Sequence, residues 1–386
     1  TAARGVSLFS NCGVGDYGYR LAGFRFDVMA DLDSRRLEVA HLNQPEAKRV
    51  PGDLRETWRE VVAQYREIAG DDPPSLLAAC PPCQGMSSAN SNRGMADDPD
   101  ASDDRNLLVT VIANVASELR PDIIVVENVT VFLTRKVRHP ETNAPISAAK
   151  LLVSSLENDY AAFPILVNLA HYGVPQNRNR TFITFVRRDL DLYRRLIETR
   201  SAPYPQPTHD PTNGGLAPIE LQDALDEFNL PLLDASTAET ASSNIDLHFV
   251  PVWDERQYNM VAAIPSSSGA SAWGNDTCES CGIVEEVGED EAVCPRCGDP
   301  LPRPIVEKPD GTYRLVKGFR STSYRRMRPD QPAATITTAS GHVGSANTIH
   351  PSQNRVFSPL ECALLQTIPL EFDWGDALKK WGHTNV

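Results

Sequence analysis

Short apolar runs alternate with amphipathic stretches over the first half of the chain. The alternation of buried strands with helices is typical of a mostly parallel sheet that is covered on both faces. Strands are expected at residues 5–10, 26–30, 76–79, 122–127 and on either side of a polar loop within 164–188, and helices at 55–69 and 105–119. The pattern predicts an α/β domain.

The character of the sequence changes near residue 189. From about residue 199 to 315 the chain is rich in Pro, Ser, Thr, Asn and Asp and has weak periodicity, which indicates a separate, loop-heavy insert. We therefore predict a first domain over 1–190 and a smaller irregular domain over 191–316. Residues 317–386 would join the two domains and return to the first.

Composition and charge narrow the class of protein. Hydrophobic residues make up 41% of the 386 residues, which is ample for a core. No apolar run approaches the roughly 20 residues of a membrane span, and the first residues are charged where a signal peptide would be apolar, so we expect a cytoplasmic protein. A net charge of −14 argues against a general nucleic-acid coat. It leaves room for an enzyme that contacts phosphates through a local basic cluster.

Four of the eight cysteines form two CxxCG turns separated by twelve residues. Two such turns can face each other and supply four thiolates in tetrahedral reach, with the glycines permitting the tight turns. A closed four-thiolate set is typical of structural zinc, which would stabilise a module with little core. The predicted ligands at 278–297 are Cys278, Cys281, Cys294 and Cys297.

Polar groups follow several predicted strands. The sequence NCGVG after the first strand is a glycine-punctuated turn, and such a turn alone is a weak sign of a nucleotide site. Asp31 and Asp53 follow the next two strands, where related folds place acids on a ribose hydroxyl and an adenine amino group. Glu127 ends the strand over residues 122–127. It is either a ligand-facing acid or a helix-capping acid.

Cys83 stands at the exit of the strand over residues 76–79. Pro81 and Pro82 stop that strand, and the segment 84–104 that follows is polar and loop-like. A cysteine between a rigid strand end and a polar loop is placed as a nucleophile would be. The alternative for an isolated cysteine is a small buried hydrophobe.

Two basic segments suggest phosphate or base contacts. Arg178 and Arg180 alternate in QNRNR and suit phosphate or a polar base, or else form a solvated pair. Residues 317–328 carry five basic residues and no acid, which is consistent with a phosphate track or an exposed linker. The expected DNA contacts of this segment are Arg320, Arg325, Arg326 and Arg328.

Taken together, these segments resemble the cytosine-5 DNA methyltransferases of bacterial type. The matching blocks, in the order of the family, are LFSNCGVGD, PPCQG, ENV, GVPQNRNR, RRMRPDQPAATIT and RVFSPLECALLQTIP. Three features depart from the family pattern. Asn11 and Val14 each replace a usual glycine, Cys80-Pro81 replaces a common Gly-Phe, and the sequence stops at GHTNV before a final GNAVP-like stretch. Cys80 is expected to contribute to strand packing and not to act as a second nucleophile.

The resemblance implies a Rossmann-like, S-adenosylmethionine-dependent methyltransferase fold. The α/β domain would bind this cofactor, and the irregular domain would carry zinc and read base edges in the major groove. The implied cofactor-binding residues are Phe9, Ser10, Asn11, Cys12, Gly13, Val14, Gly15, Asp31, Leu32, Asp53, Leu54, Pro82 and Leu108.

The resemblance also implies roles in catalysis. Cys83 would add to carbon 6 of cytosine, and Glu127 would stabilise the ring at nitrogen 3. Arg178 would hold the base oxygen or help activate the adduct, while Arg180 would support the loop or backbone. The loop from Gln84, including Ser87, would contact DNA and close over the flipped base.

The implied partner is double-stranded DNA, with a restriction-modification or phage-defence context. We expect a monomer associated with the nucleoid, with no membrane partner and with other defence-system proteins as candidate partners. Two alternatives stay open from the sequence. One is a transfer RNA cytosine-5 methyltransferase built on the same motifs, and the other is a catalytically idle DNA-binding protein.

Overall fold

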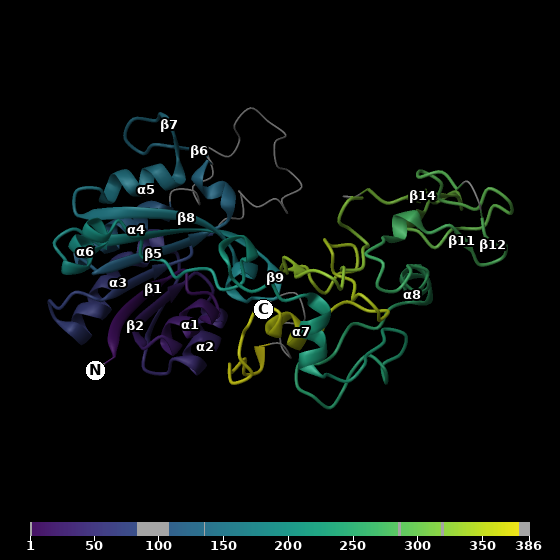
Figure 1. The fold of residues 1–386 in the computed structure, drawn as a ribbon, viewed down its shortest axis with the longest axis horizontal. Helices are drawn as coiled ribbons and strands as arrows, with labels where there is room; N and C mark the ends of the chain where they lie inside the picture. Colours follow the sequence, from purple (N-terminus) through teal and green to yellow (C-terminus); the bar gives the residue numbers. More distant parts are fainter. Residues whose placement is uncertain (1, 83–107, 135, 285–286, 318–319, 378–386) are drawn as a thin grey trace. The chain divides into compact units, whose positions relative to one another are not determined.

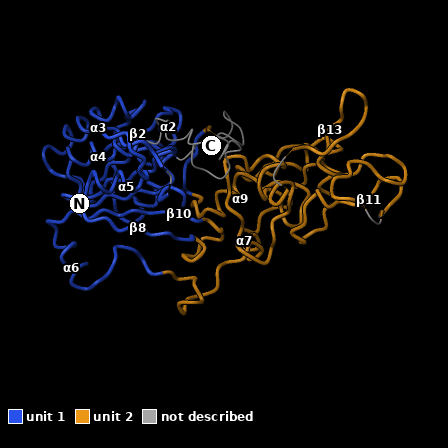
Figure 2. The backbone as a smooth tube through the Cα atoms, turned by 90° about the horizontal axis from the view of Figure 1, so that it is seen from above, with its two compact units in different colours: residues 1–168, 179–206, 371–375 blue, residues 169–178, 207–370, 376–386 orange. Residues whose placement is uncertain are grey.

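The computed structural model describes residues 2–82, 108–134, 136–284, 287–317 and 320–377. The chain forms two compact units, coloured separately in Figure 2. Unit 1 comprises residues 1–168, 179–206 and 371–375, and unit 2 comprises 169–178, 207–370 and 376–386. Each unit has its own apolar clusters.

Unit 1 is built on a seven-stranded sheet whose first five strands in sheet order run parallel. The last two strands pair antiparallel to their neighbours. In sheet order the strands are β3 (Lys48–Pro51), β2 (Phe24–Asp31), β1 (Ala3–Leu8), β4 (Leu76–Ala79), β5 (Ile123–Asn128), β10 (Asn179–Arg187) and β8 (Tyr160–Asn168). The prediction of a mostly parallel α/β sheet is confirmed.

Helices cover both faces of this sheet (Figure 1). Because side chains alternate along a strand, Leu77 and Ala79 of β4 pack with α3, α4 and α5, whereas Leu76 and Ala78 pack with residues of α2. The helices of unit 1 are α1 (Val14–Leu21), α2 (Ser34–Asn43), α3 (Leu54–Ala69), α4 (Val109–Leu119), α5 (Ala148–Leu156) and α6 (Asp191–Thr199). Unit 1 also contains η3 (Thr130–Leu133), β6 (Lys136–Arg138) and β7 (Pro145–Ser147).

Acidic residues begin two of these helices directly after a strand. Asp33 caps α2 by accepting from the backbone N–H of Arg35 at 3.0 Å. Asp53 caps α3 in the same way, accepting from the N–H of Arg55 at 2.9 Å. Such caps satisfy N–H groups that have no partner within the helix. They also fix where each strand turns into its helix.

Unit 2 is made of short elements joined by long loops. They are η4 (Leu169–Tyr172), β9 (Gln176–Asn177), η5 (Pro211–Asn213), α7 (Leu221–Phe228), α8 (Glu255–Ala262), η6 (Ala272–Gly274), β11 (Thr277–Cys278), β12 (Gly282–Ile283), β13 (Ile305–Glu307), β14 (Tyr313–Leu315), β15 (Ala333–Ala334) and α9 (Pro359–Leu364). Ser358 and Glu361 form a capping box at the start of α9, and Glu361 also pairs with the buried Arg355 at 2.6 Å. With so little regular structure, buried polar contacts hold much of this unit.

The limits of the compact units differ from the predicted domain limits at three places. The first unit continues to residue 206, since α6 packs against β10. Residues 169–178 belong to unit 2, because β9 within them pairs with β15. Residues 371–375 belong to unit 1, where the Asp373 N–H donates to Asn43 at 2.9 Å.

Among the residues that the structure describes, no helix is both long enough and apolar enough to cross a membrane.

Candidate active site and metal centre

The groups that the sequence places after strands gather at one edge of unit 1. Strands β1 to β5 are parallel, so their carboxyl ends share this edge. Asp31 ends β2, Asp53 follows β3, Cys80 follows β4, and Glu127 lies one residue before the end of β5. Ligands of parallel α/β sheets bind outside the carboxyl ends of the strands. The geometry therefore assigns this edge as the candidate site.

The backbone of the turn after β1 adopts left-handed conformations that allow a ligand to approach it closely. Phe9 and Asn11 both adopt positive φ, at 58° and 51°. Asparagine tolerates this left-handed region better than most residues, so Asn11 takes a backbone conformation that glycine would adopt freely. Gly13 has φ 76°, and a Cβ there would lie 2.9 Å from the Cβ of Ala40. Gly13 therefore has no room for a side chain.

Asp31 anchors this turn. Its Oδ2 accepts from the Asn11 N–H at 2.9 Å, and its Oδ1 accepts from the Asp33 N–H at 3.0 Å. Leu32 beside it is 73% exposed, which suits an apolar contact with a ligand. Asp53 is held by Arg55, and this hydrogen bond lowers the pKa of the Asp53 carboxyl below its usual value. Both acids are oriented at the site edge by their own local contacts.

Two buried groups lie behind the turn. Burial raises the pKa of the Cys12 thiol to about 11, so Cys12 is no reactive thiolate at neutral pH. Asp16 of α1 is also buried, and both of its oxygens are 2.9 Å from the Ser7 hydroxyl. Burial raises the pKa of Asp16 to about 7. Sequence reasoning missed Asp16, although an acid in the first turn of an amphipathic helix was visible.

Glu127 is held between two neighbouring strands. Its Oε1 lies 2.8 Å from Nε of Arg180 on β10, and its Oε2 accepts from Sγ of Cys80 at 2.8 Å. Glu127 is 28% exposed and Arg180 is 14% exposed, so the pair is partly screened from water and open on one side. The helix-capping alternative for Glu127 does not apply, because η3 that follows has no side-chain cap. A fixed, accessible carboxylate at this edge can hydrogen-bond a ligand.

Asn128 connects β5 to the exit of β4. It is buried, and its Nδ2 donates to the Pro81 carbonyl at 3.1 Å while its Oδ1 accepts from the Val129 N–H at 2.8 Å. This contact fixes the strand exit that leads to Cys83. Cys83, Gln84 and Ser87 themselves lie outside the described residues. Pro82 is half-buried, and Leu108, which precedes α4, is buried.

The two arginines of QNRNR lie in different units of the structure. Arg180 contacts Glu127, whereas the Arg178 guanidinium donates to the Ile336 carbonyl within unit 2 at 3.5 Å. The arginine that contacts Glu127 is thus Arg180, and the division expected from the sequence, with Arg178 at the base and Arg180 supporting the backbone, stays a prediction. The contacts differ because Arg178 precedes β10 and joins unit 2, while Arg180 lies in β10 beside β5.

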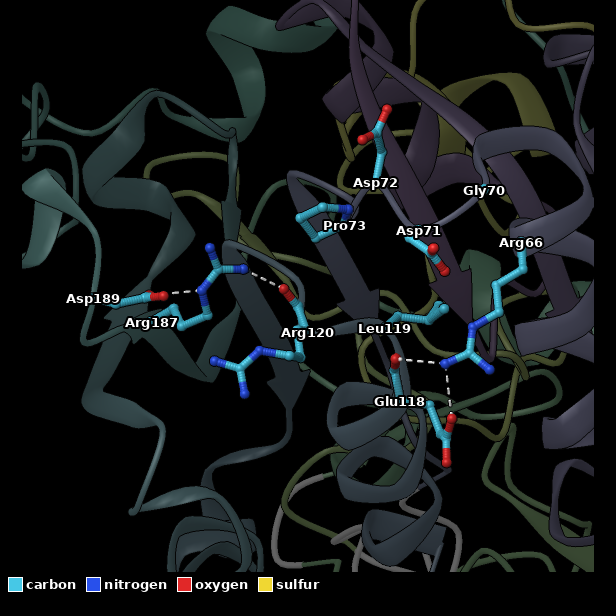
Figure 3. Close-up of a pocket in the computed structure, with 10 residues that line it drawn as sticks. All are labelled: Arg66, Gly70, Asp71, Asp72, Pro73, Glu118, Leu119, Arg120, Arg187 and Asp189. Carbon is cyan, nitrogen blue, oxygen red and sulfur yellow. Dashed lines mark hydrogen bonds and ion pairs between the residues drawn. The ribbon is translucent and has the colours of Figure 1, made fainter.

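A polar cavity of about 260 Å³ opens at the other edge of unit 1 (Figure 3). It is lined by residues before β4, before β5 and at the end of β10, such as Asp71, Glu118 and Arg187. Its arginines are engaged, Arg66 with Glu118 at 2.9 Å and Arg187 with Asp189 at 2.7 Å (Figure 3). This cavity lies at the amino ends of the parallel strands and is separate from the candidate site.

The four predicted metal ligands converge in unit 2. All four Sγ atoms lie within 4.8 Å of one another, and those of Cys278 and Cys297 are 3.6 Å apart. Sulfurs bound to one tetrahedral zinc at about 2.3 Å would be roughly 3.8 Å apart, so the cluster fits this ion. The Cys297 N–H lowers the pKa of the Cys294 thiol to about 7. Gly282 and Gly298 have positive φ of 73° and 84°, as the tight CxxCG turns require.

The expected DNA contacts divide into exposed and buried arginines. Arg326 is only 2% exposed, and its guanidinium donates to the carbonyls of Ile264, His350, Gln353 and Val261 and to Asn354. A side chain so enclosed cannot reach a phosphate, so the expectation for Arg326 is corrected to a structural role. Arg320 and Arg328 are exposed and pair with Asp290 and Asp330.

Arg325 is half-buried. Its Nε donates to the Ser321 carbonyl at 3.1 Å, and its Nη1 donates to the Gly269 carbonyl. The basic segment therefore combines the exposed Arg320 and Arg328 and the half-buried Arg325 with the fully enclosed Arg326. Composition alone does not distinguish these arginines.

A mostly parallel sheet with a glycine turn, two acids and a fixed carboxylate at one edge is typical of an α/β domain that binds a ligand at this edge, as methyltransferase domains do. The family model for C-5 cytosine-specific DNA methylases matches residues 3–380. The chain belongs to this family and is a DNA cytosine-5 methyltransferase, a family membership that implies S-adenosylmethionine as the methyl donor.

Relatives match over most of the chain. The Type II methyltransferase M1.HgaI of Avibacterium volantium is 27% identical over 95% of this chain and 88% of its own length. The Type II methyltransferase M.NgoFVII of Neisseria gonorrhoeae is 26% identical over 96% of this chain and 78% of its own length. A solved structure of a prophage-encoded E. coli protein, described as a DNA modification methyltransferase, has a TM-score of 0.54 at 21% identity. It covers 96% of this chain and 90% of its own, and it supports the fold.

Proposed function

We propose that the protein methylates carbon 5 of cytosine within a specific duplex DNA sequence, with Cys83 as the covalent nucleophile. The observation that carries this proposal is the Glu127 carboxylate. Arg180 holds it at the carboxyl end of β5, and Asn128 ties the neighbouring strand exit that leads to Cys83. An acid and a nucleophile-bearing strand end are thereby fixed on adjacent strands.

The chemistry follows from the weak nucleophilicity of cytosine carbon 5. Cys83 forms a bond to carbon 6, and the displaced electron pair spreads onto carbon 5 and the ring nitrogen. Glu127, in its protonated form, would donate a hydrogen bond to ring nitrogen 3 and so stabilise this charge. Arg180 would hold Glu127 in place beside the base. Carbon 5 would then bond to the methyl group of the bound donor, whose sulfonium becomes a neutral thioether. The carbon 5 proton would pass to solvent water and Cys83 would leave as the thiolate, which restores the aromatic ring.

S-adenosylmethionine supplies the electrophilic methyl group when it is bound. The residues that would hold it are the turn from Phe9 to Gly15, with Asp31 and Leu32 beside it and Asp53 and Leu54 at the start of α3. The positive φ at Phe9, Asn11 and Gly13 and the exposed Leu32 support this assignment. Pro82 and Leu108 complete the proposed pocket from β4 and α4.

Unit 2 is proposed as the target-recognition part. The two CxxCG turns would bind one structural zinc. The local apolar cluster of Cys278, Cys294, Val284 and Leu301 is small, and a bound metal would add the stability that this cluster lacks. Arg320, Arg325 and Arg328 would exchange their present partners for phosphates. A cytosine within a duplex cannot be reached, so the base must be flipped out, and the segment from Gln84 to Asp104 would close over it.

The relatives named as Type II methyltransferases favour a restriction-modification context for this enzyme. In that context the protein would act as a cytoplasmic monomer on nucleoid DNA and protect sites from a partner nuclease. Partner proteins of a defence system would bind outside the site described above.

Tritiated S-adenosylmethionine and duplex DNA test the proposal directly. We expect label transfer to DNA by the wild-type chain, none by Cys83→Ser, and little to RNA of the same sequence. Bisulfite sequencing of DNA from cells that express the chain would then give the target sequence. Absence of label on any DNA, or transfer by Cys83→Ser equal to the wild type, would refute the proposed mechanism.

A further inference from the structure

Cys80 occupies a position that the strand-packing expectation does not explain. The four residues of β4 are buried, whereas Cys80 directly after them is exposed. Its backbone still follows the sheet, because its N–H donates to the Leu8 carbonyl at 3.3 Å. The expectation that Cys80 serves packing is therefore wrong. Its side chain faces the site edge.

The register of the sheet places Cys80 opposite the catalytic acid. Ala79 of β4 pairs with Val126 of β5, so the next residue of each strand, Cys80 and Glu127, are neighbours on the same face. Cys80 Sγ lies 2.8 Å from Glu127 Oε2. A thiol can donate to a carboxylate, which accepts through either oxygen.

The two oxygens of Glu127 are thus held from the two strands that flank β5. Arg180 of β10 donates to Oε1, and Cys80 after β4 donates to Oε2. Each carboxylate oxygen has two lone pairs, so these contacts leave acceptor capacity for a ligand. Arg180 alone would let the carboxylate rotate about its last torsion, since terminal torsions of this kind are broad. A second donor on the other oxygen restricts that rotation.

We propose that Cys80 is a positioning residue for the methyl-transfer reaction, acting through Glu127 by a thiol-to-carboxylate hydrogen bond. The inference rests on the role proposed above for Glu127. In the addition step, the bond from Cys83 to carbon 6 forms while negative charge develops at nitrogen 3. A Glu127 carboxyl group that is fixed in one orientation presents its proton to this nitrogen without reorganising. Cys80 contributes no bond to the substrate.

The test compares Cys80→Ala, which removes the donor, with Cys80→Ser, which keeps a hydrogen-bond donor at the same place. We expect Cys80→Ala to lower kcat about tenfold, the scale of one hydrogen bond to a charged group, with KM for DNA and for the cofactor unchanged. Cys80→Ser should retain most of the wild-type kcat. Thr134→Ala, which removes an exposed hydroxyl from the same unit, is the matched control and should equal the wild type.

A second readout isolates the addition step. Addition at carbon 6 makes carbon 5 basic enough to exchange its hydrogen with water, so release of tritium from [5-³H]cytosine DNA without cofactor reports this step alone. We expect the exchange rate to fall about tenfold in Cys80→Ala and to recover in Cys80→Ser. In a Glu127→Gln background the same substitution should have little further effect, because residues that act through one another are not additive.

The outcomes separate this inference from the proposed function. Wild-type kcat and exchange in Cys80→Ala would overturn the positioning role, and equal losses in Cys80→Ser and Cys80→Ala would overturn it in favour of a steric role. Full additivity with Glu127→Gln would show that Cys80 does not act through Glu127. Wild-type activity of Glu127→Gln itself would instead overturn the role of Glu127 in the proposed function.

Discussion

The Nε atom of Arg180 lies 2.8 Å from Oε1 of Glu127, and this ion pair joins β10 to β5 at the edge where the site is built. Both residues lie in unit 1, and both are partly shielded from water. Removing one partner of such a pair leaves the other charge without its partner. This contact with Glu127 distinguishes Arg180 from Arg178 in QNRNR.

Substitution of Arg180 should impair catalysis more than substitution of Arg178. We expect Arg180→Ala to lower kcat on the order of 100-fold, because Glu127 loses its charged partner and its orientation. Arg178→Ala is the matched control two residues away, and we expect it to retain far more of the exchange at cytosine carbon 5. Tritium exchange and methyl transfer on the same duplex measure both. A larger loss of exchange in Arg178→Ala would favour the assignment made from the sequence.

The four-cysteine cluster should bind one zinc ion per chain. Cys294→Ser should abolish this binding and loosen unit 2, because the local apolar cluster is small. Elemental analysis of protein purified without chelator, followed by thermal unfolding, measures both effects. Cys80→Ser, a cysteine substitution in unit 1, should keep the full zinc content. Protein without zinc, or with zinc after Cys294→Ser, would contradict the four-thiolate site.

Asp16 should make unit 1 less stable as the pH rises. The pKa of Asp16 is about 7 in the folded chain, above the ordinary value of 3.8. At a pH between these two pKa values, Asp16 binds more protons in the folded chain than in the unfolded chain. The contribution of Asp16 to the free energy of unfolding therefore declines as the pH increases from about 4 to 7. Asp16→Asn removes this titration.

We therefore expect the stability of Asp16→Asn relative to the wild type to rise over that interval by a few kcal/mol at most, on the order of the linked pKa shift. Urea unfolding of both proteins at pH 5 and pH 7.5 measures the difference. A difference that does not change with pH, or that falls as the pH rises, would contradict the burial of a titrating Asp16.

Arg326 and Arg328 should have opposite signatures although they are two residues apart. Arg326→Ala leaves several buried carbonyls without a donor and should destabilise unit 2 by roughly 2–5 kcal/mol. Arg328→Ala removes an exposed cation that pairs only locally with Asp330, so stability should change little.

DNA binding gives the second half of this comparison. Loss of one phosphate contact in Arg328→Ala should lower the slope of log affinity against log salt by about 1. Denaturant unfolding and binding titrations at several salt concentrations separate the two effects. An unchanged salt slope in Arg328→Ala would remove this residue from the proposed phosphate track.

The sequence by itself determined the fold class, the order of the motifs and the four-cysteine cluster. Strands such as β4 and β5 are continuous apolar runs, and the helices between them carry apolar residues at helical spacing, so local patterning predicts where each begins and ends. The four cysteines were identified because CxxCG spacing alone brings each pair of thiols together. Asp31, Asp53 and Glu127 were found because strand ends of a parallel sheet share one edge.

Tertiary structure alone decided what each polar side chain contacts. Alternate arginines in a loop look equivalent in sequence, yet Arg180 lies beside β5 and Arg178 joins unit 2. From the composition of its segment, Arg326 was expected at the surface. In the structure it is buried, and the surrounding carbonyl groups accept its hydrogen bonds. Cys80 resembled a packing residue until the register of β4 against β5 placed it opposite Glu127. Such contacts depend on the register of paired strands and on the packing of segments that are distant in the sequence. The local pattern of residues does not encode either.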